Sequence, residues 1–204
     1  MKRFVAALFM LSGLMVAGKV ANAAASVIFT ETGGNVVVTF SGSIKTAALT
    51  AEGVRNYLRS IWPAQAGIKI GDINGTTCNE YSGIAGPTNW GGGGSTPTSS
   101  ASGNTIGIFG GGGYVCVPIG YSGGNLSGTS TYNGTSLSSL GLTVNTYTYT
   151  WGSGLTADSL TLYIGTTPPT PSPAPIPTFS EWAKIMMMFL LILTVGWHFR
   201  KQQN

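Results

Sequence analysis

One short stretch of this sequence matches a catalytic pattern. The residues Gly120-Tyr121-Ser122-Gly123-Gly124 fit the Gly-x-Ser-x-Gly pattern in which hydrolases carry a nucleophilic serine. Such a serine needs a general base, most often histidine, and the only histidine of this chain is His198. A chance match is expected in a chain with 31 glycines, so we interpret the stretch as a turn. A small hydrolase that uses Ser122 is kept as the third alternative.

Carboxylates and glycine runs are the other candidates for chemistry. Glycoside hydrolysis needs two partnered carboxylates, and nothing in the spacing of the exported acids marks two of them as partners. These acids are Glu31, Glu52, Asp72, Glu80 and Asp158. The glycine runs at 91–94 and 110–113 lack the Lys-Ser/Thr that completes a phosphate-binding loop. We therefore expect a protein that is not an enzyme and has no cofactor.

The chain has 2 cysteines, Cys78 and Cys116. In an exported protein, an even number of cysteines favours a disulfide, so we predict a Cys78–Cys116 bond. A metal site is the weaker alternative, because zinc would need further ligands and His198 lies in the C-terminal tail.

The N-terminal residues predict export. Lys2 and Arg3 precede an apolar run over residues 4–17, and Ala21-Asn22-Ala23 supplies the small residues that signal peptidase requires. We predict a signal peptide over residues 1–23, cut after Ala23. A retained N-terminal membrane anchor is the alternative, which Lys19 after the apolar run disfavours.

The C-terminal residues predict a single transmembrane helix over about residues 183–199. A helix of this length measures about 25 Å, the short end of the range that spans a bilayer. Trp182 and Trp197 would lie at the two membrane surfaces. Arg200 and Lys201 follow at once as a stop-transfer signal, which places the C-terminus in the cytoplasm and the main body in the periplasm. The alternative is a buried core helix.

The residues before this segment predict where its helix begins. Thr178-Phe179-Ser180-Glu181 fits a capping box, with Thr178 as the N-cap and Glu181 reaching back to it. The capping box does not explain Ile176 and Pro177, nor the position of Trp182.

The complete string Ile176-Pro177-Thr178-Phe179-Ser180-Glu181-Trp182, with the apolar segment and basic end that follow, resembles the IPTL-CTERM sorting signal. Phe179 stands where that family has leucine, and Ala183 stands where it has glycine. The family is related to the PEP-CTERM proteins, and the resemblance covers residues 176–204. It implies a temporary anchor in the inner membrane, cut near residues 176–178 by an exosortase-type sorting protease. The released protein would reach the cell surface or the extracellular matrix.

Residues 166–177 predict a spacer between the exported domain and the tail. Most of the chain's 10 prolines fall here or at its edge, at positions 168, 169, 171, 173, 175 and 177. Alternating proline favours an extended, semi-rigid chain. A proline-rich site for another domain is the alternative.

Charge excludes one class of partner. The net charge of +4 comes from the two ends, because acidic residues outnumber basic ones by one over residues 24–175. A basic footprint for nucleic acid is therefore absent from the exported part, and no nucleic-acid partner is expected.

Residues 24–165 predict one all-β domain, a small β-sandwich with about seven or eight short strands. Alternating segments at 26–30 and 35–40 flank a Gly-Gly turn, and segments at 104–109 and 114–118 flank a glycine run. Further strands are predicted at 68–70, 146–151 and 158–164. Val54, Tyr57, Leu58 and Ile61 recur at helical spacing, which predicts a short helix over residues 52–61. Residues 82–103 are predicted to form a mobile loop.

Residues 29–44 and 117–165 resemble parts of PEP-CTERM and IPTL-CTERM exported domains, and that resemblance implies no catalytic residues.

Aromatic residues leave one binding function open. Tyr147, Tyr149 and Trp151 share a face of one predicted strand, and Trp90 lies in the predicted loop. Flat aromatics can stack on sugars, although on an alternating strand they belong more often to the core. The sequence thus favours an exported, non-enzymatic surface or matrix protein. A carbohydrate-binding module that engages exopolysaccharide is the alternative.

Overall fold

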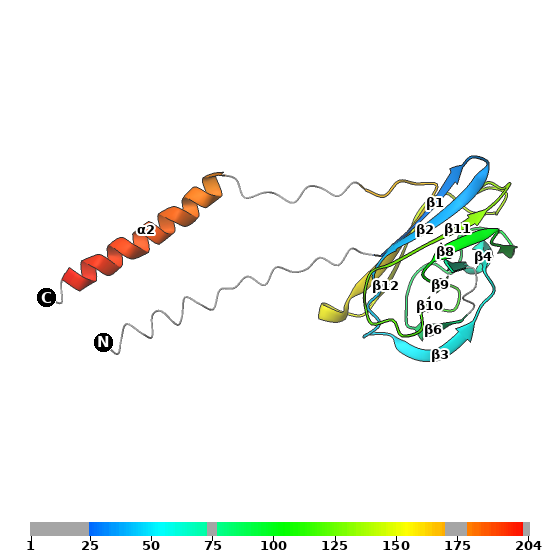
Figure 1. Cartoon of the computed structure of the whole chain (residues 1–204), viewed down its shortest axis with the longest axis horizontal. Coiled ribbons are helices and arrows are strands. Elements are labelled where there is room, and N and C mark those ends of the chain that lie inside the picture. The colour runs from blue at the N-terminus through cyan, green and yellow to red at the C-terminus, as the bar shows by residue number, and fades with distance from the viewer. Residues whose placement is uncertain (1–24, 73–76, 170–178, 202–204) are drawn as a thin grey trace. The chain divides into compact units, whose positions relative to one another are not determined.

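The computed structural model describes residues 25–72, 77–169 and 179–201 (Figure 1). The chain divides into two compact units, with the boundary between Pro168 and Pro169. The first unit contains the β-rich domain, and the second contains one helix.

The first unit has a 6-stranded and a 7-stranded sheet, here called sheet A and sheet B. Sheet A has the order β12-β13-β1-β2-β11-β8. Its strands are β1 (Ala25–Thr32), β2 (Asn35–Gly42), β8 (Ser100–Gly103), β11 (Leu126–Tyr132), β12 (Asn145–Trp151) and β13 (Asp158–Ile164). The pair β1–β13 is parallel, and the other pairs of this sheet are antiparallel.

Sheet B has the order β3-β6-β10-β9-β5-β4-β7, and all its pairs are antiparallel. Its strands are β3 (Thr50–Asn56), β4 (Ser60–Trp62), β5 (Gly67–Ile70), β6 (Thr77–Ser82), β7 (Thr96–Pro97), β9 (Ile106–Phe109) and β10 (Tyr114–Val117). Two 3-10 turns, η1 (Pro63–Gln65) and η2 (Gly154–Thr156), complete this unit.

The core lies between the two sheets and follows the alternation of the strands. Val27 and Phe29 of β1 enter the core from sheet A, and Ile68 and Ile70 of β5 enter it from sheet B. Because successive side chains of a strand point to opposite faces, the residues between these core positions face outward. The all-β sandwich predicted from the sequence is confirmed, with more strands than expected.

The two predicted hairpins are confirmed. Gly33 and Gly34, between β1 and β2, have φ of +58° and +75°, a conformation that glycine adopts at little steric cost. The run at 110–113 joins β9 to β10.

The helix predicted over residues 52–61 is wrong. β3 pairs with β6 there, and a bulge between Ala51 and Gly53 shifts the register of the two strands. Val54 and Leu58, expected on the buried face of a helix, are 56% and 82% exposed. The helical spacing was coincidental, because pairing with a strand distant in sequence determines the structure of this segment.

The loop predicted over residues 82–103 is also wrong in part. Its second half contains β7 and β8, and Trp90 is fully buried. The Trp90 amide donates to the carbonyl oxygen of Pro63 at 2.8 Å, and its indole Nε1 donates to the hydroxyl of Tyr149 at 2.9 Å. The Trp90 ring also packs edge-on against Phe29. This segment therefore contributes to the core.

The second unit contains the helix α2 (Phe179–Lys201). Its described apolar side chains, such as Ile185, Phe189 and Leu193, are exposed. Within residues 25–72, 77–169 and 179–201, no helix has the length and apolar character needed to cross a membrane.

Candidate functional site

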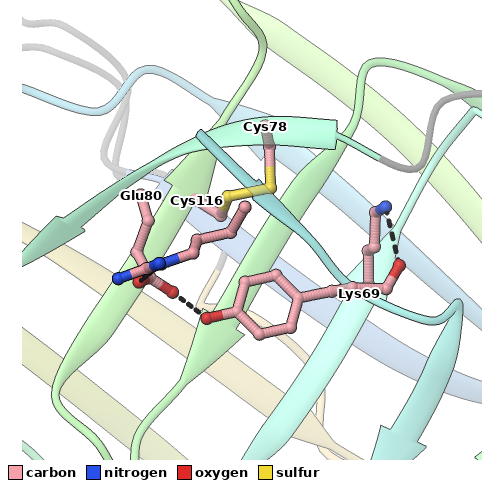
Figure 2. The surroundings of a disulfide bond; sticks show 6 residues. Lys69, Cys78, Glu80 and Cys116 are labelled. Carbon is pink, nitrogen blue, oxygen red and sulfur yellow. Dashed lines mark hydrogen bonds and ion pairs between the residues drawn. A yellow bond between two sulfur atoms is a disulfide. The ribbon is translucent and has the colours of Figure 1, made fainter. Parts of the chain in front are cut away.

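A row of side chains crosses the face of sheet B that points away from the core. Lys69 on β5 lies opposite Gly107 on β9, and Gly107 lies opposite Cys116 on β10. Cys116 in turn lies opposite Glu80 on β6. Directly opposed residues in neighbouring strands present their side chains on the same face of a sheet. Four strands thus place a lysine and a glutamate on one outer surface, with a glycine and a cysteine between them (Figure 2).

The disulfide lies within this row. Cys78 on β6 and Cys116 on β10 are bonded, with their Cα atoms 5.7 Å apart, and both residues are fully buried. The predicted disulfide is therefore confirmed. It cross-links two adjacent strands of sheet B directly beside Glu80 (Figure 2).

Glu80 is an anion with only 3% of its surface exposed. Its Oε1 accepts a hydrogen bond from Nε of Arg55 at 3.1 Å, and its Oε2 accepts one from the hydroxyl of Tyr57. Burial raises the pKa of Tyr57 above its ordinary value of 10.0, and the hydrogen bond to Glu80 raises it further. Tyr57 therefore stays a neutral donor to Glu80 at physiological pH.

Lys69 is 1% exposed. Its Nζ donates a hydrogen bond to the backbone carbonyl oxygen of Tyr57 at 3.0 Å. Burial lowers the pKa of Lys69 from its ordinary value of 10.5 to about 8, and the charge of Arg59 contributes in the same direction. Lys69 and Glu80 thus hold the two ends of one tyrosine, its backbone and its hydroxyl (Figure 2).

The ring of Tyr57 stacks on Phe109, with centroids 4.1 Å apart and planes 29° from parallel. A Cβ atom at Gly107 would lie 2.7 Å from a ring carbon of Phe109 and 3.1 Å from Cβ of Cys116. Glycine is therefore required at position 107, because the Phe109 ring covers that point of the sheet.

A groove of about 270 Å³ opens beside this stack, which we name the Trp62 groove. It is lined by Asn56, Tyr57, Leu58, Ser60, Trp62, Gly67 and Phe109. Trp62 is 40% exposed, and its neighbour in the wall, Leu58, is mostly exposed. Apart from its three aromatics, this groove has no signature in the sequence, because its walls come from segments whose pairing is non-local.

The candidate catalytic serine and acids contact different parts of the described domain. Ser122 lines a separate pocket with Lys45 and Leu155, and the sequence provides no histidine in this unit. The acids serve as acceptors for different parts of the chain. Asp158 accepts from the Lys45 amide, Glu31 from the Leu137 amide and Glu52 from the Ser82 hydroxyl.

The aromatics that the sequence offered for sugar binding belong to the core. Tyr149 and Trp90 are fully buried, and Trp151 is 5% exposed. The hydroxyl of Tyr149 donates to the carbonyl oxygen of Pro87 at 2.7 Å, and the Trp151 indole donates to the carbonyl oxygen of Lys45 at 2.8 Å. The core interpretation is confirmed for Tyr149 and Trp151, and Tyr147 is partly buried against the same core.

Several predicted site residues lie outside the described residues. They are Ala21, Ala23, Ile176, Pro177 and Thr178, together with most of the spacer at 166–177. The remaining members of the sorting string, Phe179 to Trp182, form the first turn of α2, and Arg200 and Lys201 form its end.

Comparison with family models, with curated proteins and with solved structures gives no match to this chain. We therefore base the function on the residues of this chain.

Proposed function

We propose that this protein is an exported, non-enzymatic component of the cell surface or extracellular matrix. It is held briefly in the inner membrane by residues 183–199 and sorted through its C-terminal string. The observation that carries the proposal is the division of the chain into a disulfide-bonded β-sandwich and a separate unit that contains the helix α2. A disulfide favours an oxidising compartment, in agreement with the signal peptide proposed over residues 1–23.

The string at 176–182 is proposed to act as a recognition signal for an exosortase-type protease. We expect the capping box at 178–181 to start the anchor helix and the chain before it to be extended, where a protease can reach it. Proline at positions 175 and 177 favours such an extended chain. The anchor is proposed from the sequence of residues 183–199, which contains no acidic residue and has Lys184 near its start.

A single substitution in the string tests this function. Pro177→Ala should leave the protein inserted but uncut, so that it accumulates in the inner membrane at its longer mass. Pro175→Ala is the matched control, because it removes a spacer proline just outside the string and should be processed like the wild type. The measurement is fractionation of the native host and of a strain without the sorting protease. Equal release of both variants and of the wild type, in both strains, would contradict the proposal.

A carbohydrate-binding domain that engages exopolysaccharide is the second candidate. The Trp62 groove favours it, because this groove presents aromatic side chains at the surface of the domain. Retention of the protein on a polysaccharide matrix tests this candidate.

A further inference from the structure

We infer that the Trp62 groove is the ligand site of this domain, and that it binds an uncharged sugar ring of a polysaccharide. This inference rests on the second candidate function and goes further, because it assigns the residues and the class of sugar.

The walls of the groove match the apolar face of a pyranose ring. Trp62, which is 40% exposed, supplies a flat aromatic surface, and Phe109, stacked on Tyr57 with ring centroids 4.1 Å apart, forms part of the wall. The C–H groups on one face of a sugar ring pack well against such surfaces. A volume of about 270 Å³ lies just below the usual size of pockets for drug-sized ligands, which suits one ring of a longer chain.

The polar groups of the groove match the rim of such a ring. Asn56 offers an amide that can both donate and accept, and Ser60 offers a hydroxyl. Ligand sites combine apolar walls with a few polar groups in this way, because the polar groups fix the orientation of the ligand.

The charges around the groove favour an uncharged sugar. All the described residues that line it are uncharged. Of the charged groups beside it, Glu80 is bound by Arg55 and Tyr57, Lys69 is bound to the carbonyl oxygen of Tyr57, and Arg59 is not among the lining residues. A uronic acid would therefore lose solvation in the groove without finding a cation in its lining.

The two buried charges that bond to Tyr57, a residue of the groove wall, indicate that this wall keeps its position. Burying Lys69 and Glu80 costs free energy, and an apolar pair would fill the same space at lower cost. What the two charges provide is a fixed position for Tyr57, whose backbone and hydroxyl they hold. A rigid wall reduces the ordering cost of binding.

The test is affinity electrophoresis of the full chain in mild detergent. The gels contain dextran, galactomannan or xyloglucan as uncharged polymers, or alginate as an anionic one. We expect retardation by at least one uncharged polymer, and Trp62→Ala should weaken it roughly tenfold or more, as for a central aromatic contact. Ile119→Ala is the matched control, because Ile119 is a 59% exposed apolar residue outside the groove, and it should bind like the wild type.

A second variant keeps the test valid if Trp62→Ala fails to fold. A Cβ at Gly67 would lie 3.4 Å from Cβ of Trp62 and 3.6 Å from Cδ1 of Phe109, which are ordinary contacts. Gly67→Ala should therefore fold, narrow the groove and weaken retardation. Thermal melting confirms the fold of each variant.

Four results would overturn the inference, and they are distinguishable. Retardation by alginate alone would keep the carbohydrate-binding function and reject the uncharged ring. Retardation that both groove variants leave unchanged would place the ligand elsewhere. Absence of retardation by every polymer would reject the carbohydrate-binding function itself. If no polymer retards the wild type and light scattering gives Trp62→Ala a different molar mass from the wild type, the groove would be a surface for self-association.

Discussion

The ammonium group of Lys69 donates a hydrogen bond to the backbone carbonyl oxygen of Tyr57 at 3.0 Å. Because Glu80 accepts from the hydroxyl of the same tyrosine, the connection between β3 and β4 is held at two points over the outer face of sheet B. Two nearly inaccessible charges thereby position one aromatic side chain. The predictions on stability that follow depend on this arrangement.

The buried lysine predicts a rise of stability with pH. The pKa of Lys69 is about 8 in the folded chain against an ordinary value of 10.5, so above pH 8 the unfolded chain binds more of this proton. The free energy of unfolding should therefore increase from pH 8 upward, by at most about 1.4 kcal/mol per pH unit. Urea denaturation measures the free energy of unfolding at each pH up to pH 10. Above that pH, which equals the ordinary tyrosine pKa of 10.0, ionisation of tyrosines in the unfolded chain lowers the free energy of unfolding.

Two substitutions assign this rise to Lys69. Lys69→Met should remove it, because the titrating group is gone. Lys45→Met should retain it, since Lys45 is only half-buried and its Nζ bonds to Ala157 in an exposed setting. A rise of equal size in Lys69→Met would contradict the account.

Tyr57→Phe should destabilise the domain by about 1–3 kcal/mol, because the buried Glu80 carboxylate would lose the hydroxyl donor and keep only Arg55 of this pair. The stack on Phe109 would remain. Tyr132→Phe is the matched control, since its hydroxyl makes one longer bond, at 3.3 Å, to Thr98. Its cost should be below about 1 kcal/mol. Equal midpoints and slopes for the two variants in chemical denaturation would disprove the role given to the Tyr57 hydroxyl.

Cys78→Ala should lower the free energy of unfolding by about 2–5 kcal/mol, because the unfolded chain loses a cross-link. Cys116→Ala and the double variant should match it, as both break the same bond. Alkylation without reductant should label neither thiol in the folded exported protein. Labelling of both thiols would show that the bond does not form.

The sequence predicted those parts of the fold that depend on neighbours in the chain. Alternation along β1, β2, β12 and β13 identified these strands, because a half-buried strand needs period-two patterning. The disulfide followed from the number of cysteines and the proposed compartment.

The failures have a common physical cause. Residues 52–56 belong to a strand because β3 pairs with β6, and residues 60–61 because β4 pairs with β5 and β7. Trp90 is buried because it packs on Phe29 and bonds to Tyr149. The Trp62 groove needs the register of β4, β5 and β9 together. Pairings between distant segments decide all three, and local patterns do not encode them.

Mass spectrometry of the intact mature protein from its native host tests the central claim most directly, because it reads both ends of one molecule. We expect a chain that begins at Ala24 and ends within residues 176–178, and a chain that extends to Asn204 in a strain without the sorting protease. A surface-located protein that keeps Met1, or that still ends at Asn204 in the native host, would contradict export and release through the C-terminal string.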